Sequence, residues 1–358
     1  MTRRDRERGQ ALIIVLLIVA ILAAVVVEFA YTTRVNIDIT ARMRDSLQAR
    51  RIAIAALEIE KSILLSDMNT SPTADYAVVG EFNKNAQLWS QIASFPLPVM
   101  IKDQTIGIMR GMISDEAGKF DINALIGSDT LTANQTLDGI CRRLFEALKI
   151  DPSVVDAIED WIDSDELPRP NGAESDYYSS LDPPYMAKDA PLDSITELKM
   201  IKGIDAKVFN ALMGITGQPG EIPPPDAMDS PILTVFPKYY NPVSSFKINV
   251  NTASPILLKA MYNLDNSQVQ DIVSAREQTP FLSIGDFMNE LTKVGVDPNN
   301  PDVMSVNGYI DVKSDYFSVD GIGIIGNGVT YIVRAVFYRN RASHSFTLLY
   351  WREEPFNN

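Results

Sequence analysis

The chain has 358 residues, of which 46% are hydrophobic and 22% charged, so it is long enough for two or three compact units and is not wholly disordered. Its net charge of −14 disfavours contact with nucleic acid and with anionic lipid headgroups. A single cysteine, Cys141, excludes a disulfide within the chain. With His344 as the one histidine, Cys/His zinc sites and His-assisted nucleophilic triads are set aside.

The first feature along the chain is an uncharged apolar run from Ala11 to Val27, at the short end for a membrane-spanning helix. Four arginines precede it, which places the N-terminus in the cytoplasm and the bulk of the chain outside. A cleaved secretory signal usually has an apolar stretch of about 7–15 residues followed by a turn. Here no proline or glycine follows the run until Pro72, so the chain predicts a helix that continues past the membrane.

The continuation has helical periodicity, because Ile52, Ala56, Ile59 and Ile63 recur at the spacing of one buried stripe. We therefore predict one helix over residues 10–66, about 85 Å long at about 1.5 Å per residue. Its first part, 10–31, would cross the membrane, and its second half would pack on a globular head. A plain single-pass anchor followed by a separate helix is the open alternative.

Gly9 stands directly before the apolar run, and this arrangement resembles the prepilin-like signal of type IV pilins and type II secretion pseudopilins. The resemblance implies that residues 1–9 are a leader, that a prepilin peptidase cuts after Gly9, and that Gln10 is then N-methylated. Most members carry Glu five residues after the cut, where this chain has Ile14. The family's Glu is thought to pair with the terminal amine of the subunit assembled before it. A subunit without that Glu therefore fits the leading tip of a filament.

The rest of the chain predicts a helical block between two sets of strands. "QTIGIMRGMISDEAGKFDINAL" alternates as strand, turn and strand, whereas "LWSQIASFPLPV" reads as a helical turn and proline-punctuated coil. Helical patterns follow, with a Pro/Gly-rich linker at about 217–231, and strand patterns return at the end of the chain. The predicted organisation is a head at 67–125, a two-part helical insertion at 126–305 and closing strands at 306–358. The closing strands would pair with the early ones against the long helix.

Four stretches together are similar to the general secretion pathway protein K family, the large minor pseudopilin of type II secretion. They are the prepilin-like head without its Glu, "GKFDINAL" with Lys119, Asp121 and Asn123, "IEDWIDSDELPRPNGAESDYYSSLDPPY", and "INVNTASPILLKAM" leading to "IVSAREQTPFLSIGDF". "MAKDAPL" after Tyr185 departs from an Asn-containing family pattern.

The resemblance implies an α+β fold. A long, partly transmembrane helix would pack on an antiparallel sheet, with a large all-α insertion that has helix-hairpin-helix or SAM-like parts. It implies a non-enzymatic subunit of the pseudopilus tip, anchored in the inner membrane of a Gram-negative bacterium, with its bulk in the periplasm. The partners would be the minor pseudopilins of types I, J and H, the prepilin peptidase and the inner-membrane platform. Residues Val35, Ile39 and Met43 are expected helix–helix contacts, with ordinary core packing as the equal alternative.

Between Asp156 and Asp193 the chain carries eleven acids, opposed only by Arg169 and Lys188. Such crowding raises carboxylate pKa values unless a cation relieves it, and calcium takes six to eight oxygens from irregular loops. The resemblance also implies calcium in this loop, and a solvated acidic loop is the alternative. The predicted ligands are Asp160, Asp163, Asp165, Glu174 and Asp176.

Two other functions are weighed. "INVNTASPILLKAM" with its continuation is also similar to helix-hairpin-helix modules of membrane-anchored DNA receptors, but the expected glycine hairpin is replaced by "YNLDNSQ". The second candidate hairpin, "MIKGIDAKVF", lies beside the acidic loop, so no nucleic acid is expected. An anchored periplasmic hydrolase is the other alternative, in which a carboxylate pair such as Asp163 and Glu174 would act as general acid and base. Nothing in the sequence marks a nucleophile or an oxyanion hole for such an enzyme.

Overall fold

The computed structural model describes residues 3–70, 74–76, 89, 96–214, 232–235, 247–326 and 328–356. Within these ranges, the side chains of residues 3–14, 69, 70 and 356 are outside the described part.

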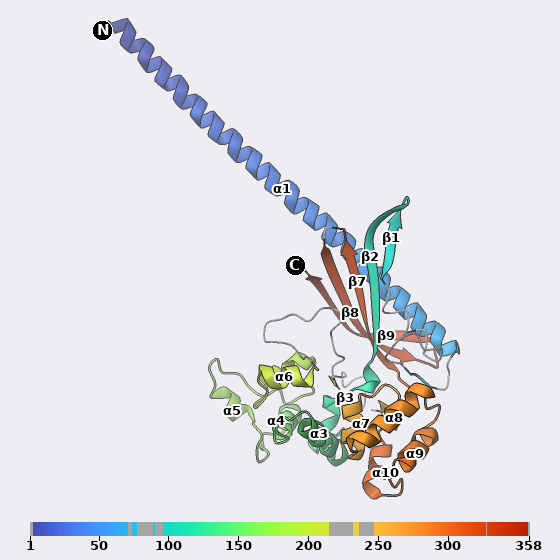
Figure 1. The fold of residues 1–358 in the computed structure, drawn as a ribbon. Coiled ribbons are helices and arrows are strands. Elements are labelled where there is room, and N and C mark those ends of the chain that lie inside the picture. Colours follow the sequence, from blue (N-terminus) through green and yellow to red (C-terminus); the bar gives the residue numbers. More distant parts are fainter. Residues whose placement is uncertain are drawn as a thin grey trace.

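The N-terminal helix α1 is continuous over Arg3–Thr70, about 100 Å at about 1.5 Å per residue. This confirms one long helix rather than an anchor followed by a separate helix. Its N-terminal half projects away from the rest of the molecule, and its C-terminal half lies across a sheet (Figure 1). An 18-residue window in its apolar part has a mean hydropathy of 2.5 and no buried residue. The helix is therefore long and apolar enough to cross a membrane.

The sheet is antiparallel and combines early and late strands in the order β1-β2-β7-β8-β9. Its strands are β1 (Leu97–Ile101), β2 (Gln104–Asp115), β7 (Tyr316–Ile325), β8 (Val329–Asn340) and β9 (Ser345–Phe356). The predicted pairing of the closing strands with the early ones is confirmed, for example where Gly111 of β2 lies opposite Gly321 of β7. The expected coil at 97–99 was wrong, because these residues belong to β1. Pro98 is tolerated there since β1 is an edge strand.

Helix α1 packs closely on the sheet through small residues. Ala49, Ala53 and Leu57 are fully buried on the helix face that the sheet covers. A Cβ built on Gly321 of β7 would lie 2.0 Å from the carbonyl oxygen of Ala53, so only glycine permits this approach. This close packing fixes the rotation of the helix about its own axis.

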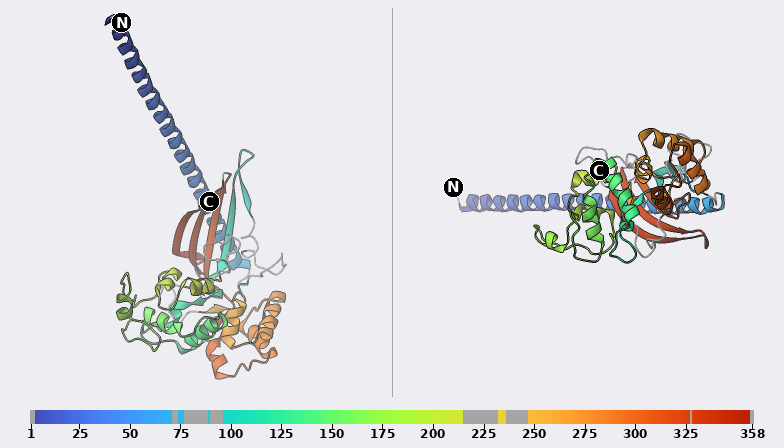
Figure 2. Two further views of the ribbon diagram at one scale, coloured as in Figure 1. Left: turned by 60° about the vertical axis from the view of Figure 1, so that its left-hand side comes forward. Right: turned by 90° about the horizontal axis from the view of Figure 1, so that it is seen from below.

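Between β2 and β7 the chain forms the helical part, which lies at the end of the sheet remote from the N-terminus (Figures 1 and 2). Its elements are η1 (Glu116–Gly118), β3 (Phe120–Asp121), η2 (Ile122–Leu125), α3 (Gln135–Ala147), α4 (Val154–Ile162), α5 (Ser175–Ser179), η3 (Ile195–Met200), α6 (Ala206–Leu212), β4 (Leu233–Thr234), β5 (Ile248–Asn249), α7 (Pro255–Tyr262), α8 (Asn266–Gln278), α9 (Ile284–Lys293), α10 (Pro301–Asn307) and β6 (Ile310–Asp311). It has its own core, in which Phe120, Leu144, Leu258 and Phe287 are buried.

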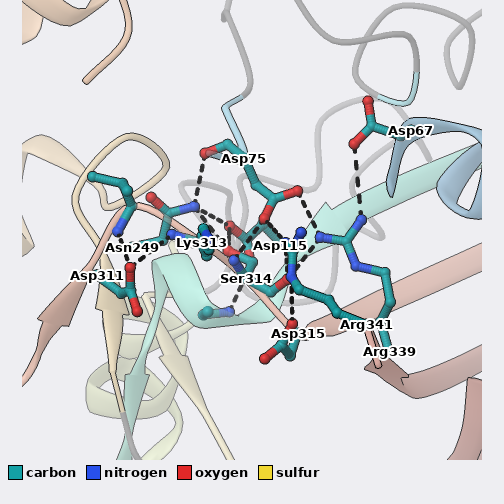
Figure 3. Close-up of polar contacts among 12 residues, drawn as sticks. Asp67, Asp75, Asp115, Asn249, Asp311, Lys313, Ser314, Asp315, Arg339 and Arg341 are labelled. Atoms are coloured by element: carbon teal, nitrogen blue, oxygen red, sulfur yellow. Dashed lines mark hydrogen bonds and ion pairs between the residues drawn. The ribbon is translucent and has the colours of Figure 1, made fainter. Parts of the chain in front are cut away.

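A buried polar joint connects the sheet to the helical part (Figure 3). Arg339 at the end of β8 is fully buried, and its Nη2 donates to Asp75 Oδ1 at 2.6 Å and to the Ser314 carbonyl at 2.7 Å. Asp115, at the end of β2, accepts from Ser314 Oγ at 2.5 Å and from Asn249 Nδ2 of the helical part at 3.1 Å. The joint therefore holds both chain crossings between the two parts.

Candidate metal centre

The acidic loop begins on α4, where the spacing of the acids decides their placement. Asp156, Glu159, Asp160 and Asp163 follow at intervals of three, one and three residues, which places them along one side of the helix. All four are buried. Burial without a partner would be costly for each charge, so the contacts of these carboxylates decide what the loop can hold.

Arg169 forms ion pairs with three of these carboxylates, those of Glu159, Asp160 and Asp163, which we call the inner half of the cluster. Its Nε lies 2.9 Å from Glu159 Oε2, and its Nη1 lies 2.7 Å from Asp160 Oδ1 and 2.5 Å from Asp163 Oδ2. The backbone N–H of Arg169 also donates to both oxygens of Asp160, at 3.3 and 3.2 Å. Asp156 has other partners: Arg142 Nη2 lies 2.7 Å from its Oδ1, and Asn171 donates hydrogen bonds to its Oδ2.

The outer half of the cluster consists of Asp163, Asp165 and Glu174, and among the described residues its one contact with a cationic side chain is that of Asp163 Oδ2 with Arg169. Asp163, Asp165 and Glu174 each offer a carboxylate oxygen, and these three oxygens lie within 4.8 Å of one another. Both oxygens of Glu174 and Oδ1 of Asp163 are shielded from solvent without a hydrogen-bond partner in the described part. Burial and repulsion from Asp160, Asp163, Asp189 and Glu166 raise the pKa of Glu174 to about 8. Oxygens in this state fit a hard divalent cation, which would supply the missing positive charge.

The structure thus brings together three of the five predicted ligands. Asp160 lies in the same cluster, but its two oxygens accept from Arg169. Asp176 is exposed on the short helix α5 and is not one of the three grouped carboxylates. Sequence reasoning missed Asp189, whose Oδ1 is shielded from solvent and has no partner in the described residues. The only sequence signal for Asp189 was its membership of the acidic set, which singles out no member.

An aromatic wall holds the distant segments of the loop together. Tyr178 packs edge-on against Trp161, with ring centroids 5.1 Å apart, and stacks on Tyr185 at 5.2 Å. The Tyr178 hydroxyl accepts from the backbone N–H of Lys202 at 3.2 Å. These contacts explain why the tyrosine pair follows Glu174 so closely, since they position the turn that carries it.

Of the two lysines in the candidate "MIKGIDAKVF" hairpin, Lys202 is occupied within the chain, whereas Lys207 is exposed. Lys202 Nζ donates to the carbonyls of Asn171 and Gly172, at 3.2 and 2.8 Å. Lys199, which directly precedes this stretch, has its Nζ 4.3 Å from the ring centroid of Phe209. The other candidate hairpin, between α7 and α8, turns at Asn263, which takes the left-handed conformation usually taken by glycine. Neither turn is glycine-rich, because the first has one glycine, Gly203, and the second has none.

The predicted assembly residues lie on the projecting arm of α1. Ile39 and Met43 are exposed, whereas Val35 is half-buried. Gly9, Gln10 and Ile14 are helical, but their side chains lie outside the described part. A shallow groove also follows this arm and is lined by Thr33, Asn36, Ile37, Thr40, Ala41 and Arg44.

The groove continues onto a face with a distinct charge. Thr40, Arg44, Leu47 and Arg51 follow at intervals of four, three and four residues and therefore share one side of the helix. All four are exposed, while Asp45, on another side, is buried. This outer face of α1 therefore carries the apolar Leu47 between two arginines, of which Arg44 pairs with Asp45 at 2.9 Å.

Comparison with known proteins identifies the family. Models of the family described as "Type II secretion system (T2SS), protein K" match residues 118–216 and 248–307, and the first of these ranges includes the acidic loop. The chain is 26% identical over 322 residues to type II secretion system protein K of Pseudomonas aeruginosa, covering 87% of this chain and 85% of the relative. It is 27% identical over 330 residues to the protein of the same name from Pectobacterium carotovorum, covering 88% of each.

A solved structure has the same fold. It is the crystal structure of the GspK-GspI-GspJ complex from the enterotoxigenic Escherichia coli type 2 secretion system. The matched chain superposes with a TM-score of 0.67 at 16% identity, and the match covers 88% of this chain and 99% of that one. The chain belongs to the type II secretion system protein K family.

Proposed function

We propose that this minor pseudopilin forms part of the tip complex of the periplasmic pseudopilus, helps to start its assembly, and acts without catalysis. The observation that carries the proposal is the placement of the helical part. It lies at the end of the sheet opposite to the projecting arm of α1 (Figure 2). A subunit anchored through α1 and widened at its far end leaves no room for another head above it, so it suits the tip.

The arm of α1 is the proposed contact with neighbouring subunits. The matched crystal structure holds GspK in complex with GspI and GspJ. We infer that this chain likewise binds minor pseudopilins of types I and J, and one of type H near them. The exposed Ile39, Met43 and Leu47 supply apolar area for helix packing. Arg51, exposed on the same side of the helix, favours a neighbour that presents an acid to this face, whereas Arg44 in the groove already pairs with Asp45.

The N-terminal region supports the rest of the assembly route. Arg3, Arg4, Arg6 and Arg8 precede the apolar part of α1, which suits an inner-membrane anchor with a cytoplasmic N-terminus. A prepilin peptidase would cut between Gly9 and Gln10, and the inner-membrane platform would then receive the mature chain. Ile14 would stand where other subunits hold Glu, which frees this subunit from pairing with one assembled before it.

The acidic loop is the proposed calcium site. Asp163, Asp165 and Glu174 would hold the ion, and Asp189 is near enough for its charge to act on Glu174. When bound, calcium would supply the positive charge that these buried oxygens lack. The residues come from three segments around the aromatic wall, so the ion would connect α4, α5 and the loop before η3.

Cysteine crosslinking in cells tests the tip contact. Leu47→Cys is expected to crosslink to a type I or J neighbour, because Leu47 is exposed on the outer face of α1. The native Cys141 is buried and should contribute no background. Ile284→Cys, exposed on the remote helical part, is the matched control and should not crosslink. Crosslinks from position 284 but not from position 47, in cells that secrete normally, would contradict the proposed arrangement.

Processing and calcium are tested separately. Gly9→Ala should leave the long precursor uncut and stop secretion, and normal cleavage of that variant would remove the pilin-like N-terminus. For calcium, the full chain in detergent should melt at a lower temperature in chelator than in calcium. Equal melting temperatures in the two conditions would show that the loop holds no structural ion.

A further inference from the structure

We infer that Arg169 is the internal counter-cation of the acidic loop and confines a bound cation to the outer half of the cluster. The inference rests on the proposed calcium site and adds to it a positioning residue and a number of ions. It predicts one divalent cation per chain, although several acids gather in this part of the molecule.

The contacts of Arg169 carry the first step. Its guanidinium lies 2.9, 2.7 and 2.5 Å from Glu159, Asp160 and Asp163, and all three carboxylates are nearly fully shielded from solvent. A planar guanidinium offers donors in several directions at once, which a single lysine ammonium cannot match with the same geometry. Arg169 thus occupies the place among these three carboxylates that a metal ion would otherwise take.

The fixing of Arg169 is the second step. Its backbone N–H donates to Asp160 while its side chain contacts the same carboxylate, so main chain and side chain are held at one point. The carbonyl of Arg169 accepts from the N–H of Gly172, which closes the turn before Glu174. The arginine is therefore part of the framework that delivers Glu174 to the outer half.

The two oxygens of Asp163 carry the third step. Oδ2 accepts from Arg169 at 2.5 Å, whereas Oδ1 is shielded and has no partner among the described residues. Asp163 therefore belongs to both groups, since one of its oxygens contacts the arginine, the other has no such partner, and one carboxylate oxygen of Asp163 lies within 4.8 Å of oxygens of Asp165 and Glu174. Arg169 leaves this carboxylate a single oxygen for the cation and so orients it for one-oxygen ligation.

Calcium titration of the full chain in detergent, followed by calorimetry, is the test. The wild type is expected to bind one calcium ion per chain. In Arg169→Gln, Glu159, Asp160 and Asp163 lose their counter-cation, so the number of ions should rise from one to two. The variant should also melt at a much lower temperature than the wild type in chelator and recover most of the difference in calcium.

Arg142→Gln is the matched control, because Arg142 lies 2.7 Å from both Asp138 and Asp156 and reaches only one of the three carboxylates, Glu159, at 4.0 Å. It should still bind one ion. One ion bound by Arg169→Gln, with wild-type melting in chelator, would overturn the inference and leave the calcium site standing. Two ions bound by the wild type would do the same. No binding by the wild type would instead remove the proposed site itself.

If Arg169→Gln does not fold even in calcium, Arg169→Lys decides. A lysine keeps the charge but reaches fewer of the three carboxylates, so the variant should melt below the wild type in chelator and regain the difference in calcium. Unchanged melting in chelator would overturn the inference. Terbium luminescence excited through the nearby Trp161 gives an independent readout of the same ion count.

Discussion

Glu60 of α1 lies directly over Gly111 of β2, so that a Cβ built on Gly111 would be 1.8 Å from Glu60 Oε1. Glu60 is buried, and its Oε2 has no hydrogen-bond partner in the described part of the chain. Burial raises the pKa of Glu60 from 4.5 to about 7. The contact between α1 and the sheet therefore contains a carboxyl group whose neutral form is favoured by burial.

This relationship predicts a loss of stability toward alkaline pH. Because the pKa of Glu60 is higher in the folded state than in the unfolded state, ionisation of Glu60 destabilises the fold. This destabilisation is absent below about pH 4.5 and is fully present above about pH 7. Glu60→Gln removes the ionisation. With allowance for solvent screening, it should stabilise the chain at pH 8 by about 1–2 kcal/mol and leave it little changed at pH 5. Thermal melts at the two pH values measure the difference.

Glu58→Gln is the control for this comparison, because Glu58 is exposed on the same helix and, within the described part of the chain, its carboxylate pairs with Lys61 of its own turn. The Glu58→Gln variant should change the melting temperature only slightly, and by the same amount at both pH values. The same pH-independent shift in Glu60→Gln would contradict a neutral Glu60.

A second prediction concerns the spacing between α1 and β7. Gly321→Ala places a methyl group 2.0 Å from the Ala53 carbonyl, so the helix must move away from the sheet. We expect a loss of at least about 2–3 kcal/mol, in the range of overpacked cores. Gly139→Ala on α3 meets its nearest atom at 3.4 Å and should be neutral or slightly stabilising. Urea unfolding of both variants compares them, and equal stability would mean that the interface yields.

A third prediction tests the joint between sheet and helical part. Arg339→Met leaves the fully buried Asp75 with a weaker set of partners, and breaking such a buried pair costs about 3–5 kcal/mol. Arg352→Met removes only a surface pair with Glu354, which is worth about 0–1 kcal/mol. Limited proteolysis should cut the Arg339 variant between the two parts at low protease concentration. Cleavage of both variants at the same rate would show that the joint is dispensable.

A fourth prediction concerns Asn123 of the "GKFDINAL" stretch. Its Nδ2 donates to the Leu192 carbonyl at 2.9 Å and its Oδ1 accepts from the Leu192 N–H at 2.8 Å. Asn123→Ala leaves both backbone groups without this partner, at about 1–3 kcal/mol. Hydrogen exchange at the Leu192 amide should therefore accelerate strongly. The exposed Asn299, which contacts Asp297 in its own turn, gives the control variant Asn299→Ala, in which Leu192 exchange should not change.

Some of the site was local enough to be read from the sequence. Asp163 and Asp165 are two residues apart at the end of α4, so their proximity needs no folding of distant segments. Glu174 reaches them only because the turn through Gly172 and the packing of Tyr178 on Trp161 fold the loop back. The sequence shows Arg169 only as a positive charge among many acids. Its contact with three carboxylates depends on the path of that turn, which the sequence pattern does not give.

The elements of the fold followed from local patterns, because helix and strand periodicities are properties of neighbouring residues. The long α1, the strand character of the closing segments and the helical block between them all come from such periodicity. The strand at 97–101 could not be predicted from such periodicity, because Pro98 disfavours any strand that is not at the edge of a sheet. Whether a strand lies at an edge is decided only when the sheet is assembled.

The amino-acid sequence by itself thus determined the long, apolar N-terminal helix, the order of strands and helices, and the acidity of the loop. The tertiary structure alone decided which charges meet. Asp75 and Arg339 are 264 residues apart and form the buried joint, and Glu60 finds Gly111 across the helix–sheet interface. The physical reason is that a pattern encodes what a segment buries, whereas the partner that it is buried against is chosen by the packing of the whole chain.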